Sequence, residues 1–254
     1  MRVNAVKQAL AAGQVQLGTN FGNLRSQDVA RILAAAGFHW AFVDCEHGGF
    51  DLETVQDICR IANYVGLAPI VRVGDLQYSL VARVLDVGAQ GVIFPRIESP
   101  ELLEKAASWT KFPPAGERGY GLTAIHVDHA KASMPEIIEH VNANTLVVLQ
   151  IETRRGVEAR DEILSVPGID AVMIGPADLS ISLGVPGEFQ HPTMVDAMEK
   201  IRESCLAHGV APGTQTRTLG LAKFWRERGM RFLGCSSETG MLLDRATELA
   251  RELA

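Results

Sequence analysis

Polar and charged residues follow several short apolar runs of the sequence, and their types suit metal-assisted acid–base chemistry. Four of these runs end in VDCEHGG, PIVRVGD, LQIETRRG and MIGPADLS. The candidate residues in these segments are Asp44, Glu46, His47, Arg72, Gln150, Glu152 and Asp178. Two carboxylates that leave other coordination positions to water or substrate suit Mg²⁺ or Mn²⁺, because these hard ions prefer oxygen ligands. We therefore expect Glu152 and Asp178 to share a divalent metal ion.

Both acids also have a structural interpretation. Glu152 could form a surface ion pair with Arg154 or Arg155, and Asp178 could cap a helix that begins at Leu179. Their joint occurrence at the ends of neighbouring apolar runs favours the shared metal over these two separate roles. Zinc is disfavoured, because it binds through more His and Cys ligands than these segments offer.

His47 and Arg72 are the candidates for proton transfer and charge stabilisation. His47 follows Asp44 by three residues. A carboxylate beside an imidazole can orient the ring and stabilise its charge, so we expect His47 to act as a general base near neutral pH. Arg72 lies inside the apolar run PIVRV, where an unpaired guanidinium would be costly to bury. Arg72 therefore needs an anion, which Glu, Asp or a ligand could supply.

Other kinds of chemistry are disfavoured. None of the six lysines lies in an apolar run, whereas a Schiff-base mechanism needs a desolvated lysine facing the substrate. The G-x-S-x-G sequence of a nucleophilic serine is absent, and no G-x-G-x-x-G follows the first apolar run. His126 and His129 form an H-x-x-H pair, which is a weak metal signal on its own, and we assign both to a loop.

The apolar runs that must position these residues are expected to be strands. They cover residues 15–19, 40–44, 69–73, 91–95, 146–152, 171–175, 210–214 and 232–236. Consecutive apolar positions are typical of parallel strands buried on both faces. Amphipathic helical segments alternate with them, and several end in a glycine just before the next strand, as in AAGFHW and ERGMRF.

Eight such units predict an α/β protein, a (β/α)₈ TIM barrel that forms a single domain over residues 1–254, rather than an open doubly wound sheet. In this fold the site is built at the carboxyl ends of the strands, where the candidate residues lie. The stretch between Pro95 and Leu146 is about twice as long as one βα unit. It contains PPAGERGYG at 113–121, which we expect to be a functional loop.

Composition and charge indicate which classes of partner are excluded and in which cellular compartment the protein is expected. The chain carries 24 basic and 30 acidic residues, for a net charge of −6, which argues against a broad nucleic-acid or anionic-membrane surface. No run approaches the roughly 18 apolar residues of a membrane span. The cysteines at 45, 59, 205 and 235 have neither C-x-x-C spacing nor a zinc-site pattern, and we expect free thiols in the cytoplasm.

Six segments, in this order, carry a resemblance to a known family. They are FVDCEHG (42–48), PIVRV (69–73), VLDVG (84–88), FPPAGERGYG (112–121), LVVLQIET (146–153) and IGPADLSISLG (174–184). The sequence resembles the metal-dependent class II pyruvate aldolases of the HpcH/HpaI type. The resemblance implies a (β/α)₈ barrel that assembles as a homohexamer, with the last helix exchanged between subunits.

The resemblance also implies roles for the metal and catalytic residues. Glu152 and Asp178 would be the metal ligands, and Arg72 would lie beside the developing enolate. His47, supported by Asp44, would be the acid–base residue.

The resemblance further implies which residues bind the substrate. Gln150 would hold the substrate or a metal-bound water, and backbone amides near Ala177 and Asp178 would receive the pyruvate carboxylate. Asp86, in VLDVG, has either a structural or an interfacial role. Arg118 and Tyr120 of a neighbouring subunit are expected at the aldehyde pocket.

Two departures from the family pattern concern the aldehyde. Cys45 stands where a small residue is usual, and LGTNFGN lacks the bulky aromatic residue found in many relatives near Asn20. Both affect the expected aldehyde specificity and leave the expected metal chemistry unchanged.

The function implied is reversible aldol cleavage of 4-hydroxy-2-oxo acids to pyruvate and an aldehyde through a metal-stabilised enolate. The expected metal is Mg²⁺ or Mn²⁺, with Co²⁺ as a further candidate. One alternative is an oxaloacetate-type decarboxylase that uses the same enolate. Others are an enolate isomerase or phosphotransferase, for which no P-loop is visible, and a catalytically silent barrel.

Overall fold

Eight parallel strands close into a barrel in which β8 pairs with β1. The computed structural model describes residues 1–121, 127 and 130–254. The strands are β1 (Gln16–Phe21), β2 (Trp40–Asp44), β3 (Ala68–Arg72), β4 (Gly91–Phe94), β5 (Leu146–Ile151), β6 (Ala171–Ile174), β7 (Gly213–Thr216) and β8 (Phe232–Ser237). The predicted (β/α)₈ TIM barrel is confirmed.

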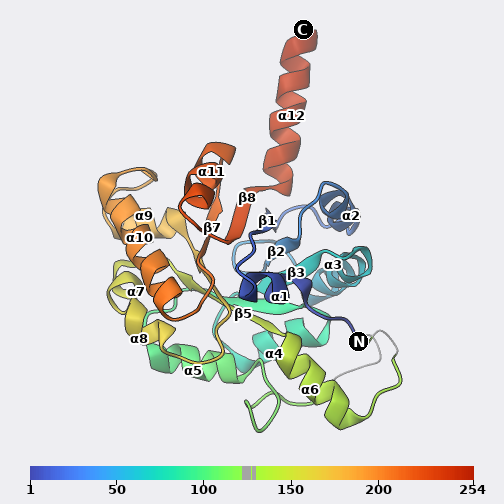
Figure 1. The fold of residues 1–254 in the computed structure, drawn as a ribbon. Helices are drawn as coiled ribbons and strands as arrows, with labels where there is room; N and C mark the ends of the chain where they lie inside the picture. Colours follow the sequence, from blue (N-terminus) through green and yellow to red (C-terminus); the bar gives the residue numbers. More distant parts are fainter. Residues whose placement is uncertain (122–126, 128–129) are drawn as a thin grey trace.

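Helices surround the barrel (Figure 1). They are α1 (Ala5–Ala11), α2 (Asp28–Ala35), α3 (Leu52–Val65), α4 (Tyr78–Asp86), α5 (Pro100–Ser108), α6 (Met134–Asn144), α7 (Arg154–Glu158), α8 (Arg160–Leu164), α9 (Pro176–Ser182), α10 (Pro192–Ala207), α11 (Leu219–Glu227) and α12 (Glu238–Leu253). Sequence signals set their ends, as α3 illustrates. Asp51 accepts a hydrogen bond from the amide of Thr54, and Gly66 ends the helix with a φ of 80° that a residue with a Cβ rarely adopts.

Successive side chains of a strand point to opposite faces of the sheet, so the apolar side chains of the barrel form two separate clusters, one outside and one inside it. The odd positions of β2 and β3, such as Val43 and Val71, belong to the cluster that packs against the helices. Even positions, such as Phe42 and Ile70, belong to the cluster inside the barrel. The ring of Trp40 stacks on Phe232 in this interior, with centroids 3.9 Å apart. Side chains at further even positions therefore point into the barrel, closer to its carboxyl end.

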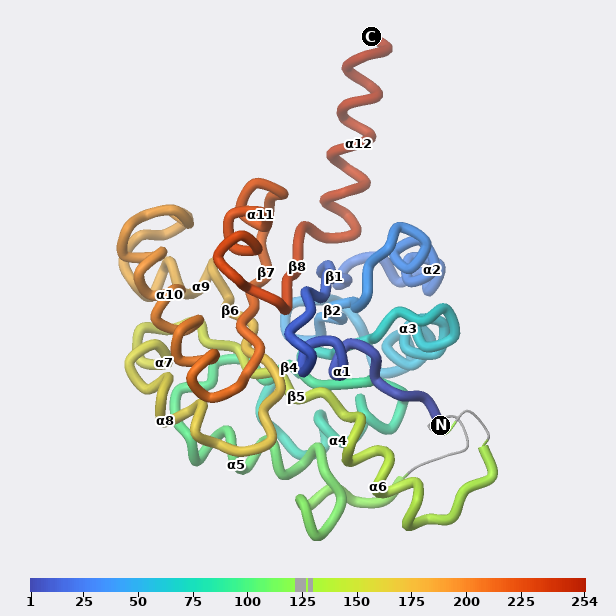
Figure 2. The backbone as a smooth tube through the Cα atoms, in the orientation of Figure 1, coloured from blue at the N-terminus to red at the C-terminus, as the bar shows by residue number. Residues whose placement is uncertain are grey.

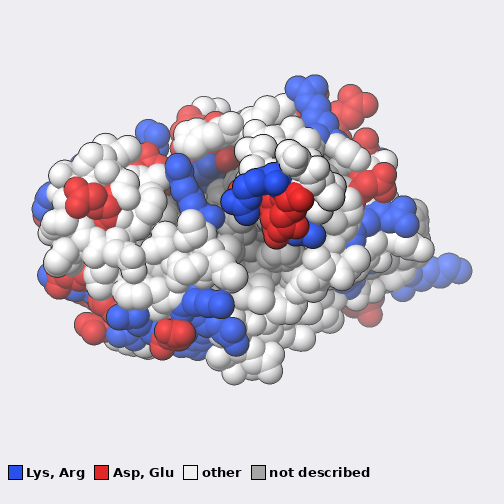
Figure 3. Space-filling view, turned by 90° about the horizontal axis from the view of Figure 1, so that it is seen from above, with Lys and Arg blue, Asp and Glu red and all other residues white. Residues whose placement is uncertain are grey.

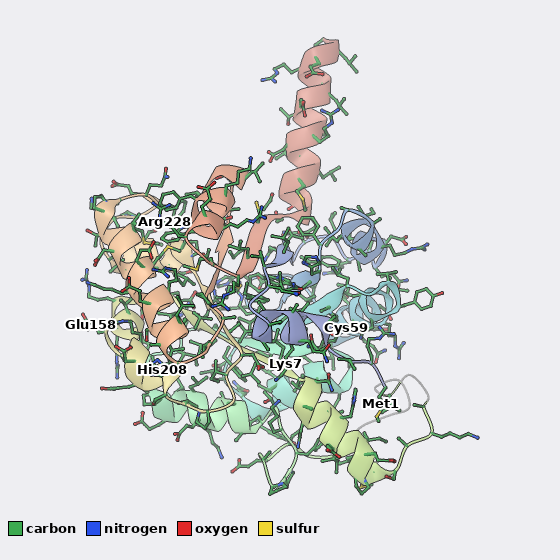
Figure 4. All side chains as sticks on the ribbon, in the orientation of Figure 1. Met1, Lys7, Cys59, Glu158, His208 and Arg228 are labelled. Atoms are coloured by element: carbon green, nitrogen blue, oxygen red, sulfur yellow. The ribbon has the colours of Figure 1, made fainter. Side chains whose placement is uncertain are left out.

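The short helix α1 lies against the other end of the barrel. Val6 and Leu10 of α1 are buried in the interior cluster. Lys7, labelled in Figure 4, donates hydrogen bonds to the carbonyl of Thr145 (3.0 Å) and to Asp170 (2.8 Å). The amino end of the barrel is thus closed by apolar packing and an ion pair, so a ligand enters the barrel from its carboxyl end.

Two elements differ from the predictions. The seventh strand was expected at 210–214 and occupies 213–216, because Pro212 has no N–H for the sheet and Ala211 makes only an isolated bridge with Ala171. The long stretch after β4 contains α6, which begins with a capping box between Ser133 and Glu136. His126 and His129 lie outside the described residues.

The last helix, α12, projects away from the barrel and ends at the carboxyl terminus, far from the amino terminus (Figures 1 and 2). Its first residue, Glu238, is buried and accepts hydrogen bonds from the amides of Gly22, Asn23 and Leu24. The base of α12 is therefore fixed to the loop after β1, and the rest extends into solvent. In the part of the chain that the structure describes, no helix is long and apolar enough to cross a membrane.

Candidate active site

The strand ends bring the candidate residues to one mouth of the barrel. Asp44 and Arg72 are register partners at the ends of β2 and β3. Gln150 lies in β5, two residues before Glu152, and Asp178 lies in the first turn of α9, which follows β6. Asp44, Arg72 and Gln150 continue the even, inward-facing rows of their strands. A cavity of about 520 Å³ opens here, with His47, Arg72, Gln150, Ala177 and Asp178 among its walls.

Arg72 is held by two carboxylates. Its Nε donates to Asp44 Oδ1 (3.0 Å) and its Nη2 to Asp44 Oδ2 (2.7 Å), while Nη1 lies 2.9 Å from Glu46 Oε2. The guanidinium also lies over the ring of Phe42, 4.8 Å from its centroid. Burial raises the pKa of Asp44, but the hydrogen bonds and charge of Arg72 more than offset this, and the net pKa is lowered. The anion that the sequence requires for Arg72 is therefore supplied by the protein.

The contacts of Asp44 correct one expectation. Asp44 was expected to orient the ring of His47, but its Oδ1 accepts from the backbone amides of Glu46 (3.0 Å) and His47 (3.2 Å). The two carboxylate oxygens are occupied by Arg72 and by these amides. The imidazole is 58% exposed, and its Nε2 lies 3.9 Å from Glu46 Oε2. Glu46, to which the sequence assigned no separate role, is thus the carboxylate nearest to the ring.

Glu152 is buried at the mouth of the barrel, where β5 and the segments that follow β4 and β6 surround its carboxylate. Its Oε1 accepts from the amide of Arg96 (3.0 Å), and its Oε2 accepts from Gln150 Nε2 (3.0 Å). Arg96 has a φ of 53°, which turns the chain after β4 toward the carboxylate. At Gly175 a Cβ would lie 2.4 Å from Glu152 Oε2, so a glycine is required for this close approach.

The two structural interpretations of the acids are wrong. Arg154 donates to the carbonyl of Leu183, and Arg155 lies 3.8 Å from Glu98, so neither pairs with Glu152. Helix α9 begins at Pro176 rather than Leu179, and Asp178 lies within its first turn instead of capping it.

The electrostatics of Glu152 indicate a place for a cation. Burial raises the pKa of Glu152 to about 7, and the charges of Asp178 and Glu46 add to this against the opposing hydrogen bond from the amide of Arg96. The charge of Arg72 is already shared by Asp44 and Glu46. The charge of Arg72 therefore offsets only part of the repulsion between Glu152 and Asp178, and a bound cation would relieve the rest.

Some sequence candidates lie elsewhere in the chain. Arg118 is buried and forms an ion pair with Asp86 (2.7 Å), and Tyr78 Oη accepts from the amide of Gly119 (2.9 Å). These contacts hold the 113–121 segment against α4, and none of its residues lines the mouth cavity of its own chain. Asn20 of β1 does line it.

Comparison with known proteins settles the family. A family model described as HpcH/HpaI aldolase/citrate lyase matches residues 19–244. The chain belongs to this family. It is 36% identical to the 4-hydroxy-2-oxo-heptane-1,7-dioate aldolase of Salmonella dublin over 97% of this chain and 93% of that protein. The resemblance seen in the sequence is confirmed, and the chain is an enzyme of the lyase class, an aldolase.

Solved structures of the HpcH/HpaI family agree with the fold. The HpcH/HpaI aldolase of Desulfitobacterium hafniense superposes with a TM-score of 0.93 at 31% identity, covering 97% of this chain and 95% of that one. A family protein from Burkholderia cenocepacia gives 0.91 at 32% identity, with 99% of both chains covered. A citrate synthase, SbnG, gives 0.84 at 27% identity, covering 97% of this chain and 96% of that one.

The HpcH/HpaI aldolases imply a divalent metal ion, and the described residues fit one. Glu152 and Asp178 offer two oxygen ligands whose mutual repulsion a cation would relieve. Among the described residues no three His, Cys, Asp or Glu side chains form a metal-binding group. Such a site leaves the remaining positions to water or substrate, as hard cations such as Mg²⁺ accept and structural zinc does not.

Proposed function

We propose that this enzyme catalyses reversible aldol cleavage of 4-hydroxy-2-oxo acids to pyruvate and an aldehyde, with Mg²⁺ or Mn²⁺ held by Glu152 and Asp178. The observation that carries the proposal is a pair of neighbouring carboxylates at the mouth of the barrel: Asp178 lines the same cavity as Arg72, and Glu152 is buried against Gln150 and Gly175, which also line it. The name of the Salmonella relative supports the substrate class. When bound, the metal ion would polarise the 2-oxo group and offset negative charge.

Arg72 and Gln150 would position and stabilise the 2-oxo acid. Two carboxylates fix the guanidinium of Arg72, so it needs little reorganisation when charge develops on the substrate. Gln150 bonds Glu152 and lies 3.5 Å from Arg72 Nη1, so it links the metal side of the site to the guanidinium side. The amides of Ala177 and Asp178 would bind the substrate carboxylate.

His47 would remove the proton of the C4 hydroxyl, directly or through water, when the C3–C4 bond breaks. The ring lies in the cavity wall and is exposed enough to exchange protons with solvent. Glu46 would stabilise the imidazolium that forms. In the condensation direction the same ring would return that proton to the C4 oxygen. The C3 proton, which pyruvate gains after cleavage and loses before condensation, would be exchanged with solvent water at the open mouth of the cavity.

Exchange of the pyruvate methyl protons with deuterated solvent tests this proposal. We expect exchange by the enzyme with Mn²⁺ or Mg²⁺, and loss of exchange once bound metal is removed with excess chelator, because the carbanion forms before any aldehyde reacts. NMR of the pyruvate signal follows the exchange. Adding an aldehyde should then give a new C–C bond, whereas an oxaloacetate-type decarboxylase would exchange the protons without forming one. Full activity in chelator would contradict the proposal.

The cellular setting follows from the same features. The four cysteines are free thiols and the net charge is −6. On the face seen in Figure 3, basic and acidic side chains are interspersed among larger uncharged areas. These observations support a cytoplasmic enzyme of one domain, residues 1–254, whose partners are small molecules rather than nucleic acid or membranes.

Helix α12 supports assembly into a homohexamer in which this helix is exchanged between subunits. Beyond its base it carries Leu242, Leu243, Leu249 and Leu253, all exposed, on a helix that projects from the barrel (Figure 2). Four leucines exposed along one projecting helix call for a partner surface, since water solvates them poorly.

Removal of residues 246–254 is therefore expected to reduce the assembly to smaller species while the barrel stays folded, because Glu238 and its contacts remain. Sedimentation velocity measures the change. Tyr64→Glu, which alters an exposed apolar residue on α3, is the control and should leave the assembly intact. A monomeric wild-type protein, or a truncated protein of unchanged size, would contradict the exchange.

A further inference from the structure

The wall of the mouth cavity opposite Arg72 is formed by β7, β8 and α11, and it does not take part in the chemistry proposed above. Thr214, Gln215 and Thr216 come from β7, Ser236 and Ser237 from β8, and Leu221 and Trp225 from α11. Two of its hydroxyls are used by the fold, because Thr214 Oγ1 donates to the carbonyl of Ile174 and Thr216 Oγ1 to that of Gly234. This wall has room for the part of the substrate that leaves as the aldehyde.

Arg217 is the cation of this wall. It directly follows β7 and lines the cavity. Ala211 belongs to the apolar cluster inside the barrel, and Arg217 lies an even number of residues after it, two beyond Gln215. Because side chains of a strand alternate between faces, Arg217 continues the inward-facing row. Ala177, whose amide is proposed to bind the substrate carboxylate, lines the same cavity.

The charges around the cavity leave Arg217 without a counter-ion. Within the described part of the chain it makes no hydrogen bond or ion pair, whereas Arg72 is bound by Asp44 and Glu46. The other charged side chains in the walls are Asp178, assigned above to the metal, and Asp244 of α12, which is exposed and makes no ion pair with Arg217. An exposed arginine in the cavity wall opposite Arg72 suits a carboxylate, which its planar fork can bind with two hydrogen bonds.

We propose that Arg217 binds a carboxylate at the far end of the aldehyde, so that the enzyme selects aldehydes that carry an acid group over neutral ones. This inference rests on the proposed aldol function and adds the chemical class of the second substrate, the aldehyde. The oxo acid reacts near Arg72, and the aldehyde extends toward β7. Arg217 takes no part in bond breaking and acts as a specificity-determining residue.

Matched pairs of aldehydes test the assignment. The acids are glyoxylate, 4-oxobutanoate and 5-oxopentanoate, each compared with its methyl ester at saturating pyruvate and Mn²⁺. We expect the wild-type enzyme to prefer at least one acid over its ester by about tenfold or more in kcat/KM. Arg217→Gln should lower kcat/KM for that acid by about 10-fold to 100-fold, mainly through KM, and change that for the ester by less than about twofold. Arg217→Lys should recover part of the loss, because it keeps the charge and loses the fork.

Controls separate this inference from the function on which it rests. Arg226→Gln removes an exposed arginine from α11 that does not line the cavity, and it should leave both substrates unaffected. Exchange of the pyruvate protons needs no aldehyde, so it should be equal in wild type and Arg217→Gln. If exchange is normal but no acid is preferred, or if Arg217→Gln affects acid and ester alike, the assignment of Arg217 is wrong. Absence of exchange in the wild-type enzyme would contradict the aldol function instead.

Discussion

Replacing Glu152 by glutamine, or Asp178 by asparagine, is expected to lower metal-dependent kcat/KM by at least about 10³-fold. Each change replaces one of the two proposed carboxylate ligands by a neutral amide, whose oxygen binds a cation more weakly, and so removes several kcal/mol of stabilisation of the charge that develops on the substrate. The loss should appear equally in proton exchange and in C–C bond formation, because both need the same carbanion. This is the largest effect that we expect from any single substitution in the site.

Binding of Mn²⁺, measured by calorimetry or electron spin resonance, gives a readout independent of turnover. Both variants should bind Mn²⁺ much more weakly than wild type. Glu98→Gln is the matched control, since Glu98 follows β4 near the mouth, accepts a hydrogen bond from Thr153 and does not line the cavity. Wild-type Mn²⁺ affinity in the Glu152 or Asp178 variants would remove these residues from the metal site.

The strands could be predicted because buried parallel strands leave an unmistakable pattern of consecutive apolar residues. The pattern failed at β7, whose sequence GTQT is polar. Its threonine hydroxyls donate to backbone carbonyls of β6 and β8, and this tertiary contact makes a polar strand stable in the barrel. As a result, the expected strand begins three residues and ends two residues before the observed one. That shift also hid the inward-facing position of Arg217, which follows the true end of β7.

The position of the site could be predicted from the rule that barrel sites lie at strand ends, but its internal contacts could not. Asp44 was assigned to His47 because the two are three residues apart in sequence. The structure pairs Asp44 with Arg72, which is 28 residues away and is its register partner on β3. Sequence spacing reports neighbours along one chain segment, whereas pairing across strands depends on register. The even spacing from Phe42 to Asp44 and from Ile70 to Arg72 was the signal that could have found this pair.

Substitution of Arg72 is expected to have the second largest effect, because Arg72 binds two carboxylates of the fold and is proposed to stabilise the reaction as well. Replacing it by methionine would leave the buried carboxylate of Asp44 without its cation, and Glu46 with Arg96 alone at 3.5 Å. We expect the free energy of unfolding to fall by about 3–5 kcal/mol, the usual cost of removing one partner from a buried ion pair. Urea denaturation at neutral pH measures this loss. The double variant Asp44→Asn with Arg72→Met should recover part of it, since the amide needs no counter-ion.

Arg72→Lys separates the catalytic contribution from the structural one. A lysine keeps one positive charge beside Asp44 and Glu46, so most of the stability should remain, but it cannot donate through Nε and two Nη atoms at once. Lysine therefore has to leave either the carboxylates or the substrate oxygen without a donor. We therefore expect Arg72→Lys to slow the proton exchange of pyruvate by about 10²-fold to 10³-fold, as happens when an enzyme loses one preorganised hydrogen-bond donor to the developing charge. His47→Ala is the informative comparison: it should slow C–C bond cleavage but leave exchange closer to wild type, because in the proposed mechanism His47 acts on the C4 hydroxyl and not on pyruvate. If Arg72→Lys exchanged protons at the wild-type rate, Arg72 would be a structural ion pair alone, and charge stabilisation would have to come from the metal side of the site.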